Sequence, residues 1–195
     1  MEFSEYKAAI VKALSLGQPA ATVARQIYLS YPTYSFSGKP DREFSIKNAI
    51  STEFRVAISD IHFGGSGKTG ESYHKKNQFI PGHSDLDAAI INNRLYLEFL
   101  EQVVVITDGF KDLTGYDKRV DELDMFLRRL QQGILIPEYM PSCEIRARWQ
   151  QFFEALSAGN TDLFKDINCW IYSTQMVYEW KFSRTINLLL SEVQQ

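Results

Sequence analysis

Hydrophobic residues recur at helical spacing through the first quarter of the chain. Phe3, Tyr6 and Ile10 fall three or four residues apart, which is the spacing of one helical face. Similar spacing follows in two further segments, and breaker residues or Ser- and Pro-rich stretches separate them. The pattern predicts N-terminal helices over residues 2–14, 20–28 and 43–54.

The hydrophobic period then shortens to that of β-strands. Apolar residues at 56, 58, 61 and 63 predict a strand that ends at Gly64 and Gly65. A polar loop over 66–84 follows, and it holds five Lys or His residues. A second strand is predicted over 85–91, because apolar and polar side chains alternate there.

The rest of the chain returns to helical spacing, with one more strand. Gly133 is a typical helix stop after a strongly helical segment. Helices are predicted over residues 94–104, 117–132, 143–157 and 174–193, and a strand over 167–172. Two nearby strands and one distant strand predict an α+β fold, a small mixed β-sheet flanked by helices. We expect a single domain, with N-terminal helices (1–54), central strands (55–92) and a C-terminal helical part (93–195).

Composition narrows the functional classes. The 195 residues include 45% hydrophobic and 23% charged residues, which is typical of a soluble globular domain. The net charge of −3 argues against a protein that coats duplex nucleic acid. Cys143 and Cys169 have no CxxC spacing, and no signal peptide or membrane-spanning run is evident. We therefore expect reduced thiols, a cytoplasmic location and no membrane partner.

Two carboxylates mark a candidate metal site. Asp85 and Asp87 are two residues apart on a predicted strand, so their side chains point to the same face. Two carboxylates that face one way form a hard oxygen site suited to Mg²⁺ or Mn²⁺. Ser84 lies next to them and is a candidate contact to a bound substrate.

A glycine turn precedes the carboxylates. Gly64 and Gly65 let backbone N–H groups approach a phosphate closely, as larger residues would not. The Ser66 hydroxyl and the Lys68 ammonium are candidates for further triphosphate contacts. The same segment superficially resembles a P-loop, but His62 stands where that motif requires its first glycine.

The two motifs together resemble the DNA polymerase beta-like nucleotidyltransferase superfamily. Its signature is a hydrophobic residue, Gly-Gly/Ser, a spacer and Asp-x-Asp on the next strand, and the resemblance covers the middle third of this chain. It implies a sheet of the nucleotidyltransferase type and catalytic, metal-binding roles for Asp85 and Asp87. It also implies a two-metal displacement that releases pyrophosphate.

The chain departs from this superfamily in two ways. The spacer before Asp85 is longer than usual, and it reads as an inserted loop. The superfamily also supplies a third carboxylate from a later strand. Asn168 stands where that acid is expected, Asp166 begins the strand, and Glu144 is a rival candidate.

Three residues near the C-terminus complete the candidates. Lys181 would reach a triphosphate if the last helix packs beside the sheet, whereas a solvent-facing helix side is the alternative. Tyr172 and Tyr178 are candidate acceptor hydroxyls, or else core or surface rings. A tyrosine-bearing C-terminal helix and an inserted loop are similar to the nucleotidyltransferases of Hailong-type anti-phage systems.

The resulting hypothesis is a nucleotidyltransferase that uses ATP or dATP. It would build short single-stranded oligonucleotides that act on an effector protein in bacterial defence. One alternative is AMP transfer to a partner protein, as in toxin–antitoxin systems. A second alternative is an inert nucleotide-binding module whose third carboxylate has been lost.

Overall fold

The computed structural model describes residues 3–73, 75–116 and 120–193. Within them the α-helices are α1 Phe3–Ser15, α2 Ala20–Ala24, α3 Pro40–Phe54, α4 Gly65–Thr69, α5 Asn93–Ile106, α6 Val120–Leu130, α7 Glu144–Ala158 and α8 Gln175–Val193. The strands are β1 Ile61–Gly64, β2 Glu71–Ser72, β3 Asn77–Gln78, β4 Leu86–Ile91, β5 Ile134–Leu135 and β6 Ile167–Tyr172. Shorter turns are the π-helical η1 Arg25–Ser30 and the 3₁₀ segments η2 Tyr34–Phe36, η3 Ile58–Asp60, η4 Thr114–Tyr116 and η5 Pro137–Tyr139.

The predicted α+β fold with a small mixed sheet is confirmed. Four strands pair in the order β1-β4-β6-β5, and a separate hairpin joins β2 to β3. β4 is antiparallel to β1 and parallel to β6, while β5 is antiparallel to β6. In the β4–β6 ladder Asp87 stands opposite Asn168, and Ala89 stands opposite Trp170.

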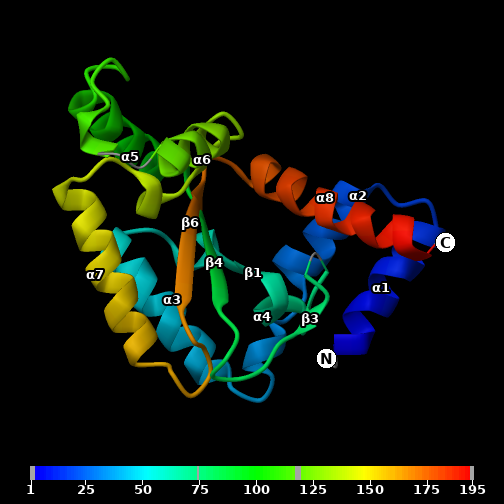
Figure 1. Cartoon of the computed structure of the whole chain (residues 1–195). Helices are drawn as coiled ribbons and strands as arrows, with labels where there is room; N and C mark the ends of the chain where they lie inside the picture. The colour runs from blue at the N-terminus through cyan, green and yellow to red at the C-terminus, as the bar shows by residue number, and fades with distance from the viewer. Residues whose placement is uncertain (1–2, 74, 117–119, 194–195) are drawn as a thin grey trace.

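One face of the sheet is fully packed. The alternating residues Leu86, Ala88 and Ile90 of β4 join a core with α3, α5 and α7, as Figure 1 shows on one side of the strands. The β6 residues on that face are also apolar. This face therefore holds the sheet rigidly and leaves the polar residues of β4 and β6 on the other face.

The second face is covered only in part. α8 packs on α1 and α2 there, and together they bury a second apolar cluster that includes Tyr178, Ile186 and Leu189. This cluster reaches the sheet at Ala89 and Tyr172, near the ends of β4 and β6. The beginnings of the same two strands stay open, and the candidate carboxylates lie there.

The structure corrects several predicted boundaries. The predicted helix over 20–28 divides into α2 and η1, and the predicted strand from residue 56 begins as η3 before β1. The polar stretch expected to be a loop contains α4, which ends at Gly70 with a left-handed φ of +82°, and the β2–β3 hairpin. β5 is an additional short strand after Gly133, whose φ is +75°. The predicted helix start at 117–119 lies outside the described residues.

Among the described residues, no helix has the length and apolar character needed to span a membrane.

Candidate functional site

Asp85 and Asp87 lie on the open face at the start of β4. Asp85 directly precedes the strand, and Asp87 is its second residue. Both line a polar hollow with the predicted residues Ser66 and Ser84, and Gly65 also lies there. The structure thus brings the carboxylate pair and the glycine turn together, as the sequence predicts.

Gly65 is in direct contact with one carboxylate. Its φ is +59°, and a Cβ at this position would overlap the Asp87 carboxylate. Gly64 pairs with Asp87 across the β1–β4 ladder, and a Cβ there would lie 2.6 Å from Cζ of Phe182. The two glycines therefore let the turn and α8 close tightly around Asp87, a steric role in addition to the predicted approach of backbone to phosphate.

The charge of Asp85 also acts on the Asp87 carboxyl group. Asp87 is open to solvent, but the surrounding protein raises the pKa of its carboxyl group, and the charge of Asp85 raises it further. Lys75 opposes this shift. A cation between the two carboxylates would relieve both effects, since it replaces lost hydration and neutralises the repulsion.

A third carboxylate does not join this pair. Asp166 lies in a different hollow beside Glu138, and its side chain is 3.8 Å from Lys165 Nζ. Glu144 is the first residue of α7, which packs on the core face. Among the described residues, no group of three or more His, Cys, Asp or Glu side chains has the arrangement of a metal site.

The available donors nevertheless fit one kind of metal. Mg²⁺ is commonly held by one or two carboxylates together with water and substrate phosphates, and it does not need a complete protein cage. Asp85 and Asp87 supply the carboxylates, and Asn168 stands beside Asp87 with an amide oxygen. The oxygen donor set therefore suits Mg²⁺ or Mn²⁺, with the substrate phosphates as the remaining ligands.

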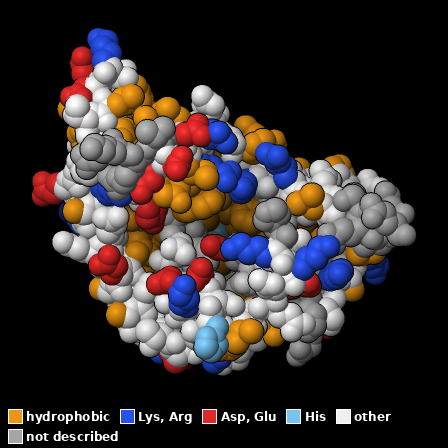
Figure 2. Space-filling view, in the orientation of Figure 1, with side chains coloured by type: hydrophobic (Ala, Val, Ile, Leu, Met, Phe, Trp, Pro, Cys, Tyr) orange, Lys and Arg blue, Asp and Glu red, His pale blue; other side chains and the backbone are white. Residues whose placement is uncertain are grey.

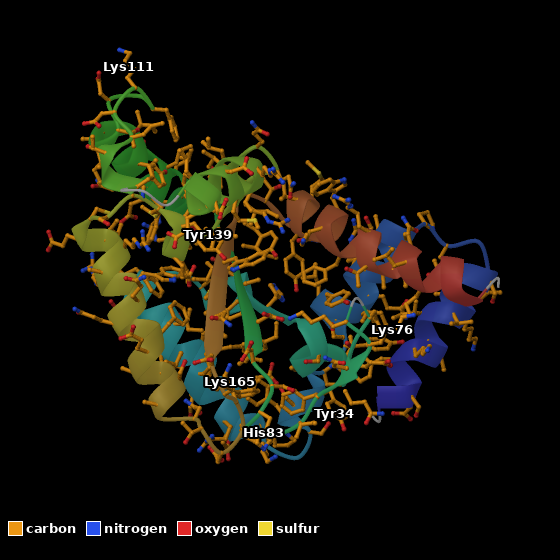
Figure 3. The ribbon with its side chains drawn as sticks, in the orientation of Figure 1. Tyr34, Lys76, His83, Lys111, Tyr139 and Lys165 are labelled. Atoms are coloured by element: carbon orange, nitrogen blue, oxygen red, sulfur yellow. The ribbon has the colours of Figure 1, made fainter. Side chains whose placement is uncertain are left out.

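The polar hollow carries positive charge opposite the carboxylates. Lys75 lines it from the β2–β3 turn, and Lys165 lines it from the segment before β6. Figure 3 shows Lys165 and His83 near the same end of β4 and β6. Ser84 Oγ accepts a hydrogen bond from Ile80 N at 3.0 Å, which fixes this hydroxyl at the wall of the hollow.

An apolar cleft adjoins the polar hollow and shares Asp87 with it. Its volume is about 170 Å³, and its walls include Trp170 and Phe182. Trp170 lies two residues beyond Asn168 on the same face of β6, opposite the small residue Ala89. The cleft is open because Ala89 and Gly64 leave space that larger side chains would fill.

Lys181 lies beside the sheet but lines the apolar cleft, and it is not among the residues of the polar hollow. It reaches the apolar cleft from α8, and burial lowers the pKa of its ammonium group. The alternative, a helix side that only faces solvent, does not describe this residue.

Lys68 is not part of this site, contrary to the prediction. Its side chain points away from the carboxylates and is only 4% exposed. Its Nζ donates to the backbone oxygen of Tyr31 at 2.5 Å, in a separate hollow that also contains Glu43 and Lys47. Burial lowers the pKa of Lys68 to about 8. The residue therefore anchors α4 to the segment after η1.

The two candidate acceptor tyrosines are buried. The Tyr178 hydroxyl donates to the backbone oxygen of Phe63 at 3.1 Å, and burial raises its pKa well above the ordinary value. Tyr172 lines the end of the apolar cleft, but it is 3% exposed and packs edge-on against Tyr178 with ring centroids 5.1 Å apart. Their packing matches the alternative interpretation as core rings.

Several site residues were not among the sequence candidates. Trp170 follows Asn168 with the period of a strand face, so the alternation in β6 could have revealed it. Phe182, Lys75 and Lys165 carry no comparable local signal, because only the packing of distant segments brings them to the carboxylates.

Comparison with known proteins found no match: no protein-family model, no curated protein and no solved structure is significantly similar to this chain.

Proposed function

We propose that this chain is a metal-dependent nucleotidyltransferase whose sheet is of the nucleotidyltransferase type. The observation that carries the proposal is the position of Asp85 and Asp87. Asp87 lies where a polar, lysine-lined hollow meets an apolar, aromatic-lined cleft, and Asp85 lines the hollow beside it. A nucleoside triphosphate has the same division, with a polyanionic chain at one end and a flat aromatic base at the other.

Each part of the substrate has a matching region. The polar hollow offers Lys75, Lys165 and the hydroxyl of Ser66 to the triphosphate. The apolar cleft offers Trp170 and Phe182 to the base, since aromatic rings stack on nucleobases with little sequence preference. The α-phosphorus would then lie near Asp87, which borders both regions.

Asp85 and Asp87 would hold Mg²⁺ or Mn²⁺ through their carboxylates. The metal, when bound, neutralises charge on the attacking and leaving oxygens of the phosphoryl group. Positioning and charge neutralisation account for most of phosphoryl transfer, so a small set of residues is sufficient. The protein would use ATP or dATP to extend a hydroxyl acceptor and release pyrophosphate, with short single-stranded oligonucleotides as products that act on an effector protein in bacterial defence.

One observation favours a different function. Asn168 occupies the ladder position opposite Asp87, where the superfamily resemblance predicts an acid. An inert nucleotide-binding module would show this loss. Such a module would bind triphosphates without converting them, so turnover separates the two functions. AMP transfer to a partner protein is a further reaction of the same site, and its product would be a labelled protein.

The test is incubation of the purified chain with each labelled ribo- and deoxyribonucleoside triphosphate and Mg²⁺ or Mn²⁺. Asp85→Asn and Asp87→Asn should each lower turnover by at least 100-fold, since each removes a charged metal ligand at little cost in volume. Asp108→Asn is the matched control, because Asp108 lies on an exposed loop after α5. Triphosphate binding without metal-dependent turnover in the unmodified chain would favour the inert module.

A further inference from the structure

A second group of cations lies beside the apolar cleft, apart from the lysines of the polar hollow. Arg129 extends from α6, and Lys181 and Arg184 extend from α8; these three residues are called the α6–α8 basic cluster. The Arg129 guanidinium and the Lys181 ammonium lie 5.5 and 5.9 Å from the ring centroid of Trp170. Figure 2 shows Lys and Arg side chains gathered beside an apolar hollow on this face.

The cluster has no acidic counterpart. Within residues 3–73, 75–116 and 120–193, no carboxylate lies within ion-pair distance of Arg129, Lys181 or Arg184. The neighbouring Arg128 is different, because it forms an ion pair with Asp124.

The three positive charges also act on one another. Burial lowers the pKa of Lys181, and the charges of Arg129 and Arg184 lower it further. These like charges repel one another, and a bound anion would neutralise the repulsion.

Aromatic side chains accompany these cations. Arg184 lies 5.6 Å from the ring centroid of Trp180, which is 40% exposed on the same side of α8. Trp180 does not line the apolar cleft, so its ring is separate from the proposed base site. Exposed rings interleaved with cations are typical of surfaces that bind single-stranded nucleic acid.

A nucleoside triphosphate bound in the proposed way would not neutralise the α6–α8 basic cluster. Its phosphates form a single chain, and Lys75 and Lys165 already provide positive charge for them in the polar hollow. Trp170 lies two residues along β6 from Asn168, about 7 Å from the carboxylate end of the sheet. Arg129 and Arg184 line neither the polar hollow nor the apolar cleft, so they are available to a second anionic ligand.

We propose, on the basis of the proposed function, that this second ligand is a separate single-stranded nucleic acid that serves as the acceptor. Its backbone phosphates contact the α6–α8 basic cluster and place its terminal hydroxyl at the α-phosphorus. The hydroxyl oxygen forms a bond to that phosphorus, the bond to the β-phosphate oxygen breaks, pyrophosphate leaves, and the hydroxyl proton passes to solvent. The buried Tyr172 and Tyr178 are not the acceptor.

The test measures binding apart from chemistry. A fluorescein-labelled ten-nucleotide single strand, as DNA and as RNA, is titrated with the full chain in the absence of triphosphate, at 50 to 200 mM salt. Three phosphate contacts predict a slope of about −2.1 in log K against log salt, or about 20-fold weaker binding across this range. Lys181→Gln/Arg184→Gln should reduce the slope to about −0.7. Lys181→Arg should leave it unchanged, and so should Arg128→Gln, which alters the adjacent ion-paired residue.

Extension of the same strand is measured in parallel with labelled triphosphates. Binding with the predicted slope, together with extension that the double variant loses, would support the proposal. Turnover that labels only the protein, or a strand that binds the double variant as tightly as the unmodified chain, would overturn it and leave the nucleotidyltransferase function standing. Strand binding without turnover of any triphosphate would overturn the proposed function itself, and with it the acceptor role. Thermal unfolding of each variant shows whether a loss of binding reflects a loss of fold.

Discussion

Gly65→Ala tests how closely the glycine turn packs against the Asp87 carboxylate. The native φ of +59° costs about 1–2 kcal/mol for a residue with a Cβ, because Cβ crowds the backbone. The new Cβ would also overlap the Asp87 carboxylate, which has to move. A displacement of about 1 Å at a reacting centre costs on the order of 100-fold in rate. We therefore expect a moderate loss of stability and a much larger loss of metal-dependent turnover.

Gly17→Ala is the matched control for this variant. Gly17 has a φ of +77°, and a Cβ there would have no other atom within 4 Å. It should show the same left-handed strain, a fall in Tm of about 2–8 °C, with full turnover. Differential scanning calorimetry and the triphosphate assay are applied to both variants. A Gly65→Ala protein that matches Gly17→Ala in both stability and turnover would refute the close packing of the turn on Asp87.

Three further predictions concern other parts of the structure. Asn168→Asp should lower the Mg²⁺ concentration for half-maximal turnover by about tenfold, because it adds a charged ligand beside Asp87; an unchanged Mg²⁺ titration would place residue 168 outside the proposed metal site. Tyr178→Phe should cost about 1 kcal/mol, the worth of one buried hydrogen bond, and should keep turnover and any labelling of the protein; loss of labelling with an intact fold would make Tyr178 the acceptor after all. Glu179→Gln should lower Tm at neutral pH, because hydrogen bonds from Arg25 hold the pKa of Glu179 below its ordinary value. That contribution is present above the ordinary carboxyl range and is lost as the pH falls through the lowered pKa, so Tm measured against pH should show the two proteins converging in acid.

Local periodicity was sufficient for β4 and β6 and for the direction of the Asp87 side chain. Leu86, Ala88 and Ile90 alternate with polar positions, and this alternation predicts which face of β4 packs and which face carries Asp87. The same reasoning applied to β6 gives Ile167 to Tyr172 with the observed limits. The direction of side chains that depends only on the period of one strand could therefore be predicted from the sequence.

Side chains on short polar segments could not be placed in this way. Lys68 lies three residues after Gly65, and a triphosphate contact was a reasonable expectation for a lysine near such a turn. In α4 its ammonium instead meets the Tyr31 backbone oxygen, in a hollow separate from the carboxylates. Five residues carry too little periodicity to reveal a helix, and the contact that orients it spans 37 positions of the chain.

The register between β4 and β6 could not be predicted from local sequence patterns either. Asp87 and Asn168 are opposite each other although more than seventy residues separate them, and only their parallel pairing places them together. The α6–α8 basic cluster could not be predicted for the same reason, because Arg129 and Trp170 are far apart in the sequence and only the fold brings them together. The sequence pointed to residue 168 as the position of the expected third acid, but it could not show that Asp87 is its partner in the β4–β6 ladder.

The apolar cleft beside Asp87 exists because small residues lie on two neighbouring strands of the sheet. Gly64 on β1 and Ala89 on β4 lie on the face that α8 approaches, and Phe182 of α8 closes on Gly64 instead of on a side chain. Larger residues at either position would fill the space between α8 and the sheet, whereas Trp170 opposite Ala89 can border it as a wall. One face of the sheet is filled by large apolar side chains. The other face has only Gly64 and Ala89 beside Asp87, and this difference leaves room for the apolar cleft. That asymmetry connects the alternating pattern of the strands to a site with a charged end and an aromatic end.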